Sequence, residues 1–332
     1  MIALIIDKFE DVGIQGLKQL GCEVVQNTKL AGAAADAIAA EIARVKPAVL
    51  IVRSTKVPAG ALAQAESLRL IVRAGSGVDN IDVPAATAKN IAVCNCPGMN
   101  AVAVAEITMG LLLACDRRIP DQVIAARAGQ WNKKEFAKGK GLKGLTLGVI
   151  GCGAIGKEVI RRAKAFDMHV IGWSRSLTQA SARDLGVEFG GNDRTHLPAL
   201  AAKCDAITIH LPGGADTKQF IDKSFFAAMK PGAYFINTSR GSVVNEADLR
   251  DAITAKGLRA GLDVYDNQPT EPQAPWQSPT IALPGVFGTH HAGASTDQAQ
   301  AAIAEETVRV VTAFKHTGKL ENCVNAGLLK PR

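Results

Sequence analysis

The sequence predicts a two-domain α/β protein, and three observations lead to this prediction. Its 332 residues exceed the roughly 150 residues of an average domain. Hydrophobic residues make up 47% of the chain and aromatic residues only 5%, a composition that favours helices packed on sheets over an aromatic-rich β-sandwich. Short β-branched segments also alternate with Ala-rich segments. We therefore expect a doubly wound parallel sheet of the Rossmann type and a second, smaller flavodoxin-like α/β domain.

The first hundred residues alternate between strand-like and helix-like segments. The pattern at residues 12–20 predicts a helix, and aliphatic runs predict strands at residues 2–6, 48–52, 68–72 and 91–94. Strands joined through helices run parallel, so this part is typical of a small βαβ domain. Pro97 and Gly98 then interrupt the pattern, and the apolar run 101–118 predicts a long helix.

A second and stronger alternation begins after the Gly/Lys-rich segment that ends at Gly144. Helices are expected at 154–166 and 245–256, and strands at 145–150, 168–173, 206–210, 233–237 and 258–263. The amphipathic run 297–316 predicts a long final helix, after which too few residues follow for another domain. We therefore expect a discontinuous substrate domain of residues 1–97 and 296–332, and a dinucleotide-binding domain of residues 98–295.

Charge, cysteine content and hydropathy limit the functional classes. The net charge of +7 favours anionic small molecules, because no dense basic tract with interleaved aromatic residues indicates nucleic-acid binding. The seven cysteines include no CxxC pair, and the N-terminus lacks signal-peptide features, so we expect a reducing cytoplasm, buried thiols and no metal site. The apolar run 101–115 is too short to span a membrane.

The segment Gly151-Cys152-Gly153-Ala154-Ile155-Gly156 matches the G-x-G-x-x-G pattern. It follows a predicted strand and opens a predicted helix, which is the context of a dinucleotide-binding turn. The first glycine permits the tight turn, the second lets the backbone approach a pyrophosphate, and the third allows the helix to pack closely on the strand. The helix N-terminus then faces the anion.

The end of the next predicted strand bears on the choice of cofactor. An acidic residue about 20 residues after the glycines usually binds the adenosine ribose of NAD. Here Ser174, Arg175 and Ser176 follow the strand instead. With no carboxylate to repel a 2′-phosphate and an arginine to bind one, NADP(H) is favoured, and NAD(H) remains possible.

Two later segments lie where strands of this sheet end. They are residues 237–241 (NTSRG) and 289–296 (THHAGAST), and we expect both near the nicotinamide. With Arg53-Ser54, the run 73–80 (RAGSGVDN), Gln130-Trp131 and the run 260–265 (AGLDVY), these motifs occur in an order that resembles the D-2-hydroxyacid dehydrogenase family over nearly the full chain. The resemblance is strongest to the D-3-phosphoglycerate dehydrogenase branch, and we expect the chain to lack that branch's C-terminal regulatory domain.

The resemblance implies roles for individual residues. Arg240 resembles the arginine that holds the substrate carboxylate, and His291 the acid–base histidine, although His290 stands where the family usually has proline. It further implies cofactor contacts from Leu211, Thr238, Ser239, Asp263 and Gly293. The substrate is expected to contact Arg53, Ser54, Arg73, Gly75, Ser76, Gly77 and Asn100, with Lys133 or Lys134 of a partner subunit as further donors.

One position departs from the family pattern. The family places a glutamate five residues after the aspartate, where it pairs with the catalytic histidine, but here Gln268 follows Asp263 at that spacing. Formate dehydrogenase, in the same superfamily, has a similar glutamine, so the substitution does not imply inactivity. Glu271 is the alternative partner of His291.

The resemblance implies oxidation of D-3-phosphoglycerate to 3-phosphohydroxypyruvate, a step of serine biosynthesis. An NADP-dependent glyoxylate or hydroxypyruvate reductase is the first alternative, which Ser174 and Arg175 favour. A dinucleotide-sensing binding protein similar to the family's transcriptional corepressors is a minor one. We also expect a homodimer, because the apolar run 101–118 exceeds what one face against the sheet requires and family members pair through this region.

Overall fold

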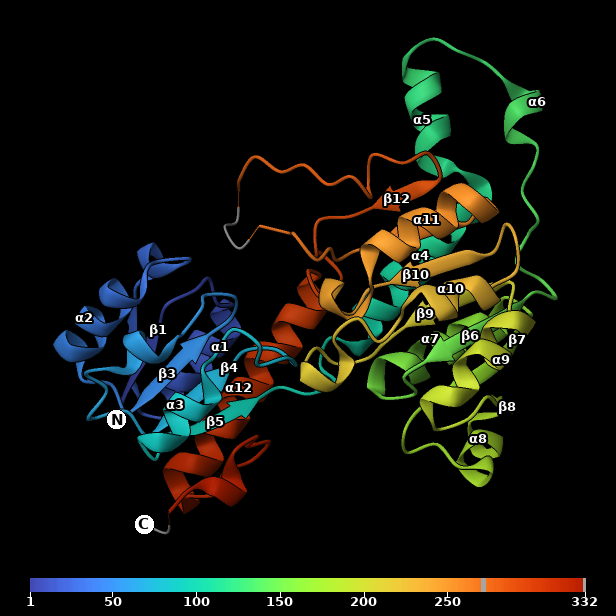
Figure 1. Cartoon of the computed structure of the whole chain (residues 1–332). Coiled ribbons are helices and arrows are strands. Elements are labelled where there is room, and N and C mark those ends of the chain that lie inside the picture. The colour runs from blue at the N-terminus through green and yellow to red at the C-terminus, as the bar shows by residue number, and fades with distance from the viewer. Residues whose placement is uncertain (270–272, 331–332) are drawn as a thin grey trace. The chain divides into compact units, whose positions relative to one another are not determined.

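The computed structural model describes residues 1–269 and 273–330. Their internal contacts form two compact units (Figure 1). Unit 1 contains residues 1–100, Gln273 and residues 295–330, and unit 2 contains residues 101–269 and 274–294. The sequence-based division, at 97/98 and 295/296, differs from these positions by a few residues.

Unit 1 is built on a five-stranded parallel sheet of order β2-β1-β3-β4-β5. Its strands are β1 (Ile2–Ile5), β2 (Glu23–Gln26), β3 (Val49–Val52), β4 (Leu70–Arg73) and β5 (Ala92–Asn95). Its α-helices are α1 (Asp11–Gln19), α2 (Ala35–Val45), α3 (Val83–Ala88) and α12 (Asp297–Thr317), with 3-10 turns at Thr28–Leu30, Ala59–Leu62 and Ala326–Leu328. The central strand β3 is buried at every position, as a sheet covered on both faces requires.

The last long helix returns to the first domain, against α1. A side chain at Gly13 or Gly16 of α1 would come within 2.9 Å of Ala304 or Val308 of α12, so glycine permits the close approach of the two helices. The helix begins after Thr296, whose hydroxyl accepts a hydrogen bond from the Ala299 amide at 3.2 Å. This packing joins two segments of unit 1 that lie some 280 residues apart in sequence.

Unit 2 contains a seven-stranded parallel sheet of order β12-β11-β10-β9-β6-β7-β8. Its strands are β6 (Thr146–Ile150), β7 (His169–Trp173), β8 (Glu188–Phe189), β9 (Ala206–Ile209), β10 (Tyr234–Asn237), β11 (Arg259–Leu262) and β12 (Val286–Gly288). Its α-helices are α4 (Ala101–Arg117), α5 (Ile119–Arg127), α6 (Lys133–Phe136), α7 (Ala154–Ala165), α8 (Gln179–Leu185), α9 (Leu197–Lys203), α10 (Lys223–Ala228) and α11 (Glu246–Lys256), with 3-10 turns at Arg194–His196, Ala215–Thr217 and Gly241–Val243. The strand order reverses direction between β6 and β9, the switch point at which doubly wound sheets bind nucleotides. The fold class is as the sequence predicts.

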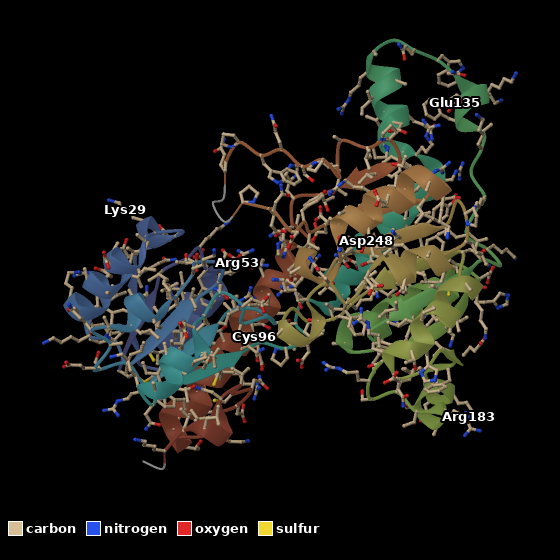
Figure 2. All side chains as sticks on the ribbon, in the orientation of Figure 1. Lys29, Arg53, Cys96, Glu135, Arg183 and Asp248 are labelled. Atoms are coloured by element: carbon tan, nitrogen blue, oxygen red, sulfur yellow. The ribbon has the colours of Figure 1, made fainter. Side chains whose placement is uncertain are left out.

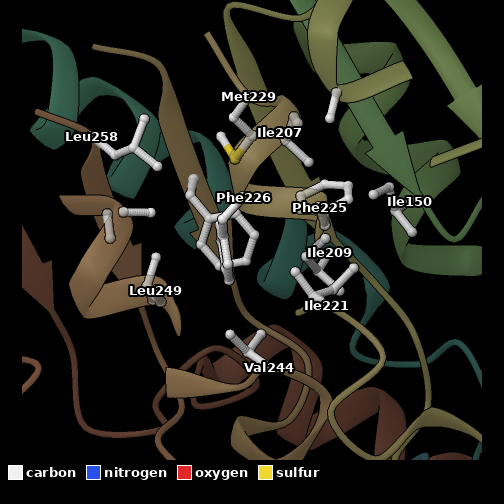
Figure 3. Close-up of a cluster of buried hydrophobic side chains, with 14 of the residues drawn as sticks. Ile150, Ile207, Ile209, Ile221, Phe225, Phe226, Met229, Val244, Leu249 and Leu258 are labelled. Atoms are coloured by element: carbon white, nitrogen blue, oxygen red, sulfur yellow. The ribbon is translucent and has the colours of Figure 1, made fainter. Parts of the chain in front are cut away.

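The core of unit 2 explains why its sheet is stable without many aromatic residues. Figure 3 shows one face, where Phe225 and Phe226 of α10 lie among aliphatic side chains of β6, β9 and α11. Phe226 meets Phe235 of β10 edge-on, with ring centroids 5.1 Å apart. On the other face, α4 packs against β10, β11 and α7. A side chain at Gly261 would come within 2.8 Å of Leu111, so glycine admits this helix.

Three strands and one extension were not expected from the sequence. β2, β8 and β12 have two to four residues each and little periodic signal. α5 and α6 form an arm, defined here as residues 119–137, that projects from the rest of unit 2 (Figure 1). Within residues 1–269 and 273–330, no helix combines the length and apolar character needed to span a lipid bilayer.

Candidate active site

The glycine-rich turn connects β6 to α7 in unit 2. Gly151 has φ +101°, and a side chain there would come within 2.5 Å of the His210 carbonyl oxygen. A side chain at Gly156 would come within 2.0 Å of the Gly151 carbonyl oxygen, whereas one at Gly153 would meet nothing within 4 Å. Gly151 and Gly156 are therefore required by the fold, and Gly153 leaves open backbone at the N-terminus of the 12-residue helix α7. This arrangement fits a dinucleotide pyrophosphate.

His210 follows β9 directly beside this turn, and no sequence motif predicts a role for it. Its Nε2 lies 3.0 Å from the Thr208 hydroxyl. Burial lowers the pKa of this imidazole to about 3, so His210 is neutral at physiological pH. The sequence indicates only that His210 stands at the end of a predicted strand, residues 206–210.

Ser174 and Arg175 follow β7, the strand next to β6. The Arg175 side chain is 63% exposed, and its Nη1 lies 3.9 Å from Oδ2 of Asp216. Asp216 lies in the turn Ala215–Thr217 after β9 and has an 85% exposed side chain. The sequence did not reveal this carboxylate, because it lies about 40 residues away along the chain. It is placed to balance the arginine charge.

The segment after β10 is held by the buried Asn237. Its Oδ1 accepts hydrogen bonds from the Ser239 amide and hydroxyl at 3.0 and 2.7 Å, and its Nδ2 donates to the Arg240 carbonyl at 2.9 Å. Arg240 Nη1 donates to the Ser239 carbonyl at 2.8 Å. The Thr238 hydroxyl lies 2.9 Å from that of Thr108 on α4. Asn237 therefore determines the path of the backbone that carries Arg240.

The carboxylate of Asp263 organises the loop after β12. Its side chain is buried, and Oδ1 accepts hydrogen bonds from the Thr289 hydroxyl at 2.6 Å and the Ala292 amide at 2.8 Å. Oδ2 accepts one from the Gly293 amide at 2.9 Å, and the His291 amide donates to the Asp263 carbonyl at 2.8 Å. Asp263 thus fixes residues 289–293 whatever contact it makes with a cofactor.

His291 is brought against Gln268 by this loop. Gln268 Nε2 lies 2.7 Å from Nδ1 of His291, and Gln268 Oε1 accepts a hydrogen bond from the Tyr265 amide at 3.1 Å. Because an amide N–H only donates, Oε1 is committed to Tyr265, and the amide nitrogen of Gln268 faces the imidazole. His291 has φ +52°, a conformation that is unfavourable for a non-glycine residue and is typical of functional sites.

This orientation determines the proton positions on the neutral imidazole. Gln268 Nε2 donates, so Nδ1 of His291 accepts, and the ring proton resides on Nε2. A second proton on Nδ1 would oppose the Gln268 amide group unless that amide turned over and released the Tyr265 N–H. Glu271, the alternative partner, lies outside the described residues.

In unit 1, the predicted substrate residues follow three adjacent strands at the same edge of the sheet. Arg53 and Ser54 follow β3 (Figure 2 labels Arg53), Arg73 ends β4, and Asn100 follows β5. Gly75 has φ +148°, and a side chain there would collide with the Arg73 guanidinium. The absence of a side chain at Gly75 therefore leaves room for the Arg73 guanidinium beside the 75–77 loop.

Two further polar residues position this edge. The Ser76 hydroxyl lies 2.8 Å from Asn100 Oδ1, which links the 75–77 loop to Asn100. Asp7, two residues after β1, is buried, and its Oδ2 accepts hydrogen bonds from the amides of Arg53, Ser54 and Thr55 at 2.6 to 3.3 Å. Asp7 was not identified from the sequence, because an acidic residue after a strand has no distinctive motif.

Each sheet therefore collects its own set of site residues. In unit 2, the predicted catalytic and cofactor residues lie after strands at the carboxyl edge of the seven-stranded sheet: Gly151, Gly153, Ala154, Ile155, Gly156, Ser174, Arg175, Leu211, Thr238, Ser239, Arg240, Asp263, Gln268, His291 and Gly293. Lys133 and Lys134 lie elsewhere, on α6. In unit 1, the predicted residues lie at the ends of β3, β4 and β5. Among the described residues, no three His, Cys, Asp or Glu side chains are grouped as metal ligands.

Comparisons with known proteins find a matching family and several relatives. Residues 109–293 match the family model "D-isomer specific 2-hydroxyacid dehydrogenase, NAD binding domain". A D-3-phosphoglycerate dehydrogenase from Methanocaldococcus jannaschii is 42% identical over 83% of this chain and 51% of its own length. A hydroxypyruvate reductase from Thermotoga maritima is 40% identical over 81% of this chain and 85% of its own.

Solved structures show the same likeness. An NADPH-dependent glyoxylate/hydroxypyruvate reductase from Sinorhizobium meliloti, in complex with NADP and malonate, matches with a TM-score of 0.80 and 27% identity, over 100% of this chain and 98% of its own. The chain spans 51% and 60% of the length of the first two curated relatives. With its matched nucleotide domain and the sequence identity to these relatives, the chain belongs to the D-isomer-specific 2-hydroxyacid dehydrogenase family.

Proposed function

We propose that this protein transfers a hydride between a nicotinamide dinucleotide and a D-2-hydroxyacid or the matching 2-oxoacid. The observation that carries the proposal is the Gln268–His291 contact at 2.7 Å. This pair follows β11 and β12, next to the strand that presents Arg240 and on the same sheet edge as the glycine turn. An acid–base group, a carboxylate-binding arginine and a nucleotide turn are what the reaction needs.

Each residue has a defined task in this reaction. A nicotinamide dinucleotide held at this sheet edge would supply or accept the hydride at C2 of the substrate. Arg240 holds the substrate carboxylate through paired N–H donors. His291 exchanges the proton with the C2 oxygen through Nε2, the ring nitrogen that Gln268 does not face. Both the imidazolium used in reduction and the Nδ1–H tautomer used as base in oxidation carry a proton on Nδ1, so in these forms the Gln268 amide turns over and its Oε1 accepts from Nδ1–H. Gly153 and the N-terminus of α7 bind the pyrophosphate, and Ser174, Arg175, Leu211, Thr238, Ser239, Asp263 and Gly293 complete the cofactor site.

We propose D-3-phosphoglycerate as the hydroxyacid, oxidised to 3-phosphohydroxypyruvate as in serine biosynthesis. The support lies in unit 1, where Arg53 and Arg73 come from neighbouring strands. A substrate that carries a phosphate dianion in addition to its carboxylate accounts for the two arginines of unit 1. Curated relatives that carry this name are 35% to 42% identical to the chain. The cysteine content supports a cytoplasmic location.

A second candidate is an NADP-dependent glyoxylate or hydroxypyruvate reductase. The exposed Arg175 after β7 favours it, as does the likeness to reductases described as NADPH-dependent. Initial rates of 3-phosphoglycerate oxidation, measured beside glyoxylate and hydroxypyruvate reduction with both cofactors, separate the two. The first proposal requires the highest kcat/KM with 3-phosphoglycerate or its oxoacid. Tight NADPH binding with no turnover would support the corepressor-like alternative.

We propose NADP(H) as the preferred cofactor. Arg175 forms an ion pair with the 2′-phosphate of NADP(H), whereas the carboxylate of the nearby Asp216 repels that phosphate. Replacing Arg175 by alanine is expected to raise the KM for NADPH about fivefold, since an exposed charge contact contributes about 1 kcal/mol, and to leave the KM for NADH unchanged. Asp216→Asn is expected to lower the KM for NADPH. Equal effects of Arg175→Ala on both cofactors would contradict the assignment.

We also propose that the chain pairs with a second copy. The apolar run 101–118, on which the expectation of a homodimer rests, is mostly buried within unit 2 as α4, so we place the interface on the arm of residues 119–137. Ile124 is 67% exposed and Trp131 is 89% exposed, and an apolar hollow lined by Ile119, Val123, Trp131 and Phe136 lies between α5 and α6. Figure 2 places Glu135 on this arm. Apolar exposure of this extent favours a self-complementary interface.

Sedimentation velocity at micromolar concentration tests this pairing. The parent is expected to sediment as a dimer and Ile124→Lys as a monomer, because the interface would bury an unpaired charge. Leu328→Lys is the matched control, since Leu328 is 72% exposed but lies outside the arm, and it is expected to remain dimeric. A monomeric parent, or dissociation by both variants alike, would overturn the proposal.

A further inference from the structure

The C-terminal segment of unit 1 covers the outer edge of its sheet. β5 is the edge strand, and residues 322–324 run antiparallel to it. The Asn95 amide donates to the Asn322 carbonyl at 3.2 Å, and the Val324 amide donates to the Val93 carbonyl at 2.9 Å. Between these two hydrogen bonds, Cys94 lies directly opposite Cys323.

The register of this pair is the relevant feature. Cys94 and Cys323 form a non-hydrogen-bonded pair of an antiparallel ladder: the backbone hydrogen bonds on either side join their neighbours and not the two residues themselves. In such a pair the Cα atoms lie about 4.5 Å apart and the side chains are close together. Disulfides span Cα separations of about 4.4 to 6.8 Å. Both cysteines belong to the same hydrophobic cluster of unit 1. All seven cysteines are described, and each is a free thiol.

We propose that Cys94 and Cys323 are a site of reversible oxidation, at which a low-molecular-weight disulfide such as oxidised glutathione converts the two thiols into a cross-strand disulfide. The bond would join the C-terminal segment to β5 covalently. It requires no rearrangement of the backbone, because the pairing that it needs is already formed.

The two thiols differ in the way that such a reaction requires. Cys94 is fully buried, whereas Cys323 is only partly buried and is the cysteine that solvent reaches. A hydrogen bond between the two sulfurs lowers the pKa of the Cys323 thiol, helped by backbone amides of Asn325 and Val93, and raises the pKa of the Cys94 thiol. Cys323 is therefore the attacking group and Cys94 the resolving one.

The reaction proceeds in two exchange steps. The Cys323 thiolate attacks one sulfur of oxidised glutathione and forms a mixed disulfide, while the other glutathione leaves as a thiolate. Cys94 then loses its proton and attacks Cys323 Sγ, which releases the second glutathione as a thiolate. Two protein thiols are oxidised and one glutathione disulfide is reduced to two thiols.

The neighbouring Cys96 is not the partner. It lies after β5 (Figure 2), and its sulfur lies 3.4 Å from the Thr307 hydroxyl and 3.7 Å from the Ile303 carbonyl of α12. Burial raises the pKa of this thiol. Cys96 thus faces the helix that covers the sheet, and it lacks an opposing cysteine.

Oxidised glutathione added to the full-length chain tests the proposal. We expect a product lighter than the parent by two hydrogen atoms, and peptide mapping without reductant to join the peptides of residues 94 and 323. The oxidised chain is expected to migrate faster on a non-reducing gel, because a loop from residue 94 to residue 323 is closed. Its thermal midpoint is expected to rise by several degrees and to return to the parent value with dithiothreitol.

Two variants make the test specific. Cys323→Ser alters a partly exposed side chain and is expected to abolish both the fast-migrating form and the thermal shift. Cys22→Ser, the control in the same unit, is expected to retain both. A stable glutathione adduct on Cys323 that never resolves, or a disulfide that joins any other pair, would overturn the proposal.

Discussion

Replacing Arg240 by lysine is expected to lower kcat/KM for the 2-oxoacid about 100-fold or more. The aliphatic part of the Arg240 side chain packs against Gly213, where an added Cβ would lie 3.1 Å from Arg240 Cγ. The guanidinium Nη1 donates a hydrogen bond to the Ser239 carbonyl at 2.8 Å. Lysine keeps the positive charge but presents its donors from a single nitrogen, so it lacks the planar fork with which arginine grips both carboxylate oxygens while one N–H bonds the Ser239 carbonyl. A 100-fold loss corresponds to about 2.7 kcal/mol of transition-state stabilisation.

Steady-state kinetics with a cofactor-binding measurement check this result. The dissociation constant for the reduced dinucleotide is expected to stay within about twofold, because Arg240 is assigned to the substrate. Arg194→Lys is the matched control, since Arg194 is an exposed arginine of unit 2 that pairs with Asp222 at 2.7 Å, and it is expected to retain parental kcat/KM. An Arg240→Lys enzyme as active as this control would remove Arg240 from the reaction.

Replacing Gln268 by glutamate is expected to move the pH profiles of both reaction directions to higher pH, by about one pH unit or more. In the parent, the Gln268 amide donates to Nδ1 of His291 and favours the neutral ring. A carboxylate at this position instead accepts from an Nδ1–H and attracts the imidazolium, so it raises the pKa of the His291 ring.

The direction in which each pH profile moves follows from the protonation state of His291 that the reaction uses. Reduction requires the imidazolium as acid and declines as pH rises through its pKa, so in Gln268→Glu it persists to higher pH. Oxidation requires the neutral imidazole as base and increases as pH rises through the same pKa, so its acidic limb also moves upward. At a fixed pH midway between the two pKa values, a shift of about one pH unit changes the two rates about threefold, in opposite directions.

A neighbouring charge controls for nonspecific electrostatics. Asn267→Asp adds the same charge one residue away, where Asn267 Nδ2 bonds the Gln277 carbonyl at 3.0 Å and not the histidine. Its pH profiles of kcat/KM are expected to remain close to those of the parent. If the Gln268→Glu profiles overlay the parent's as well, Gln268 is not the partner of His291, and Glu271 becomes the residue to test.

The sequence by itself determined the fold class and predicted which residues form the candidate site. Glycines at 151, 153 and 156 after an apolar run specify a turn with positive φ and close packing, which few other sequences allow. Strands buried on both faces, such as β3 and β9, are recognisable as continuous aliphatic runs. The amphipathic pattern of residues 297–316 likewise located α12. These signals are local, because each depends on residues within about one turn or strand of one another.

The tertiary structure alone decided what lies beside each residue. Asp7 and His210 have no motif of their own, and they join the candidate site only because parallel strands bring their carboxyl ends to one edge of each sheet. The same holds for Asp216 beside Arg175 and for Cys323 opposite Cys94. The direction of the Gln268 amide depends on a backbone N–H that no sequence pattern specifies. Sequence fixes conformation through short-range sterics, whereas hydrogen-bond partners distant along the chain are set by the packing of whole elements.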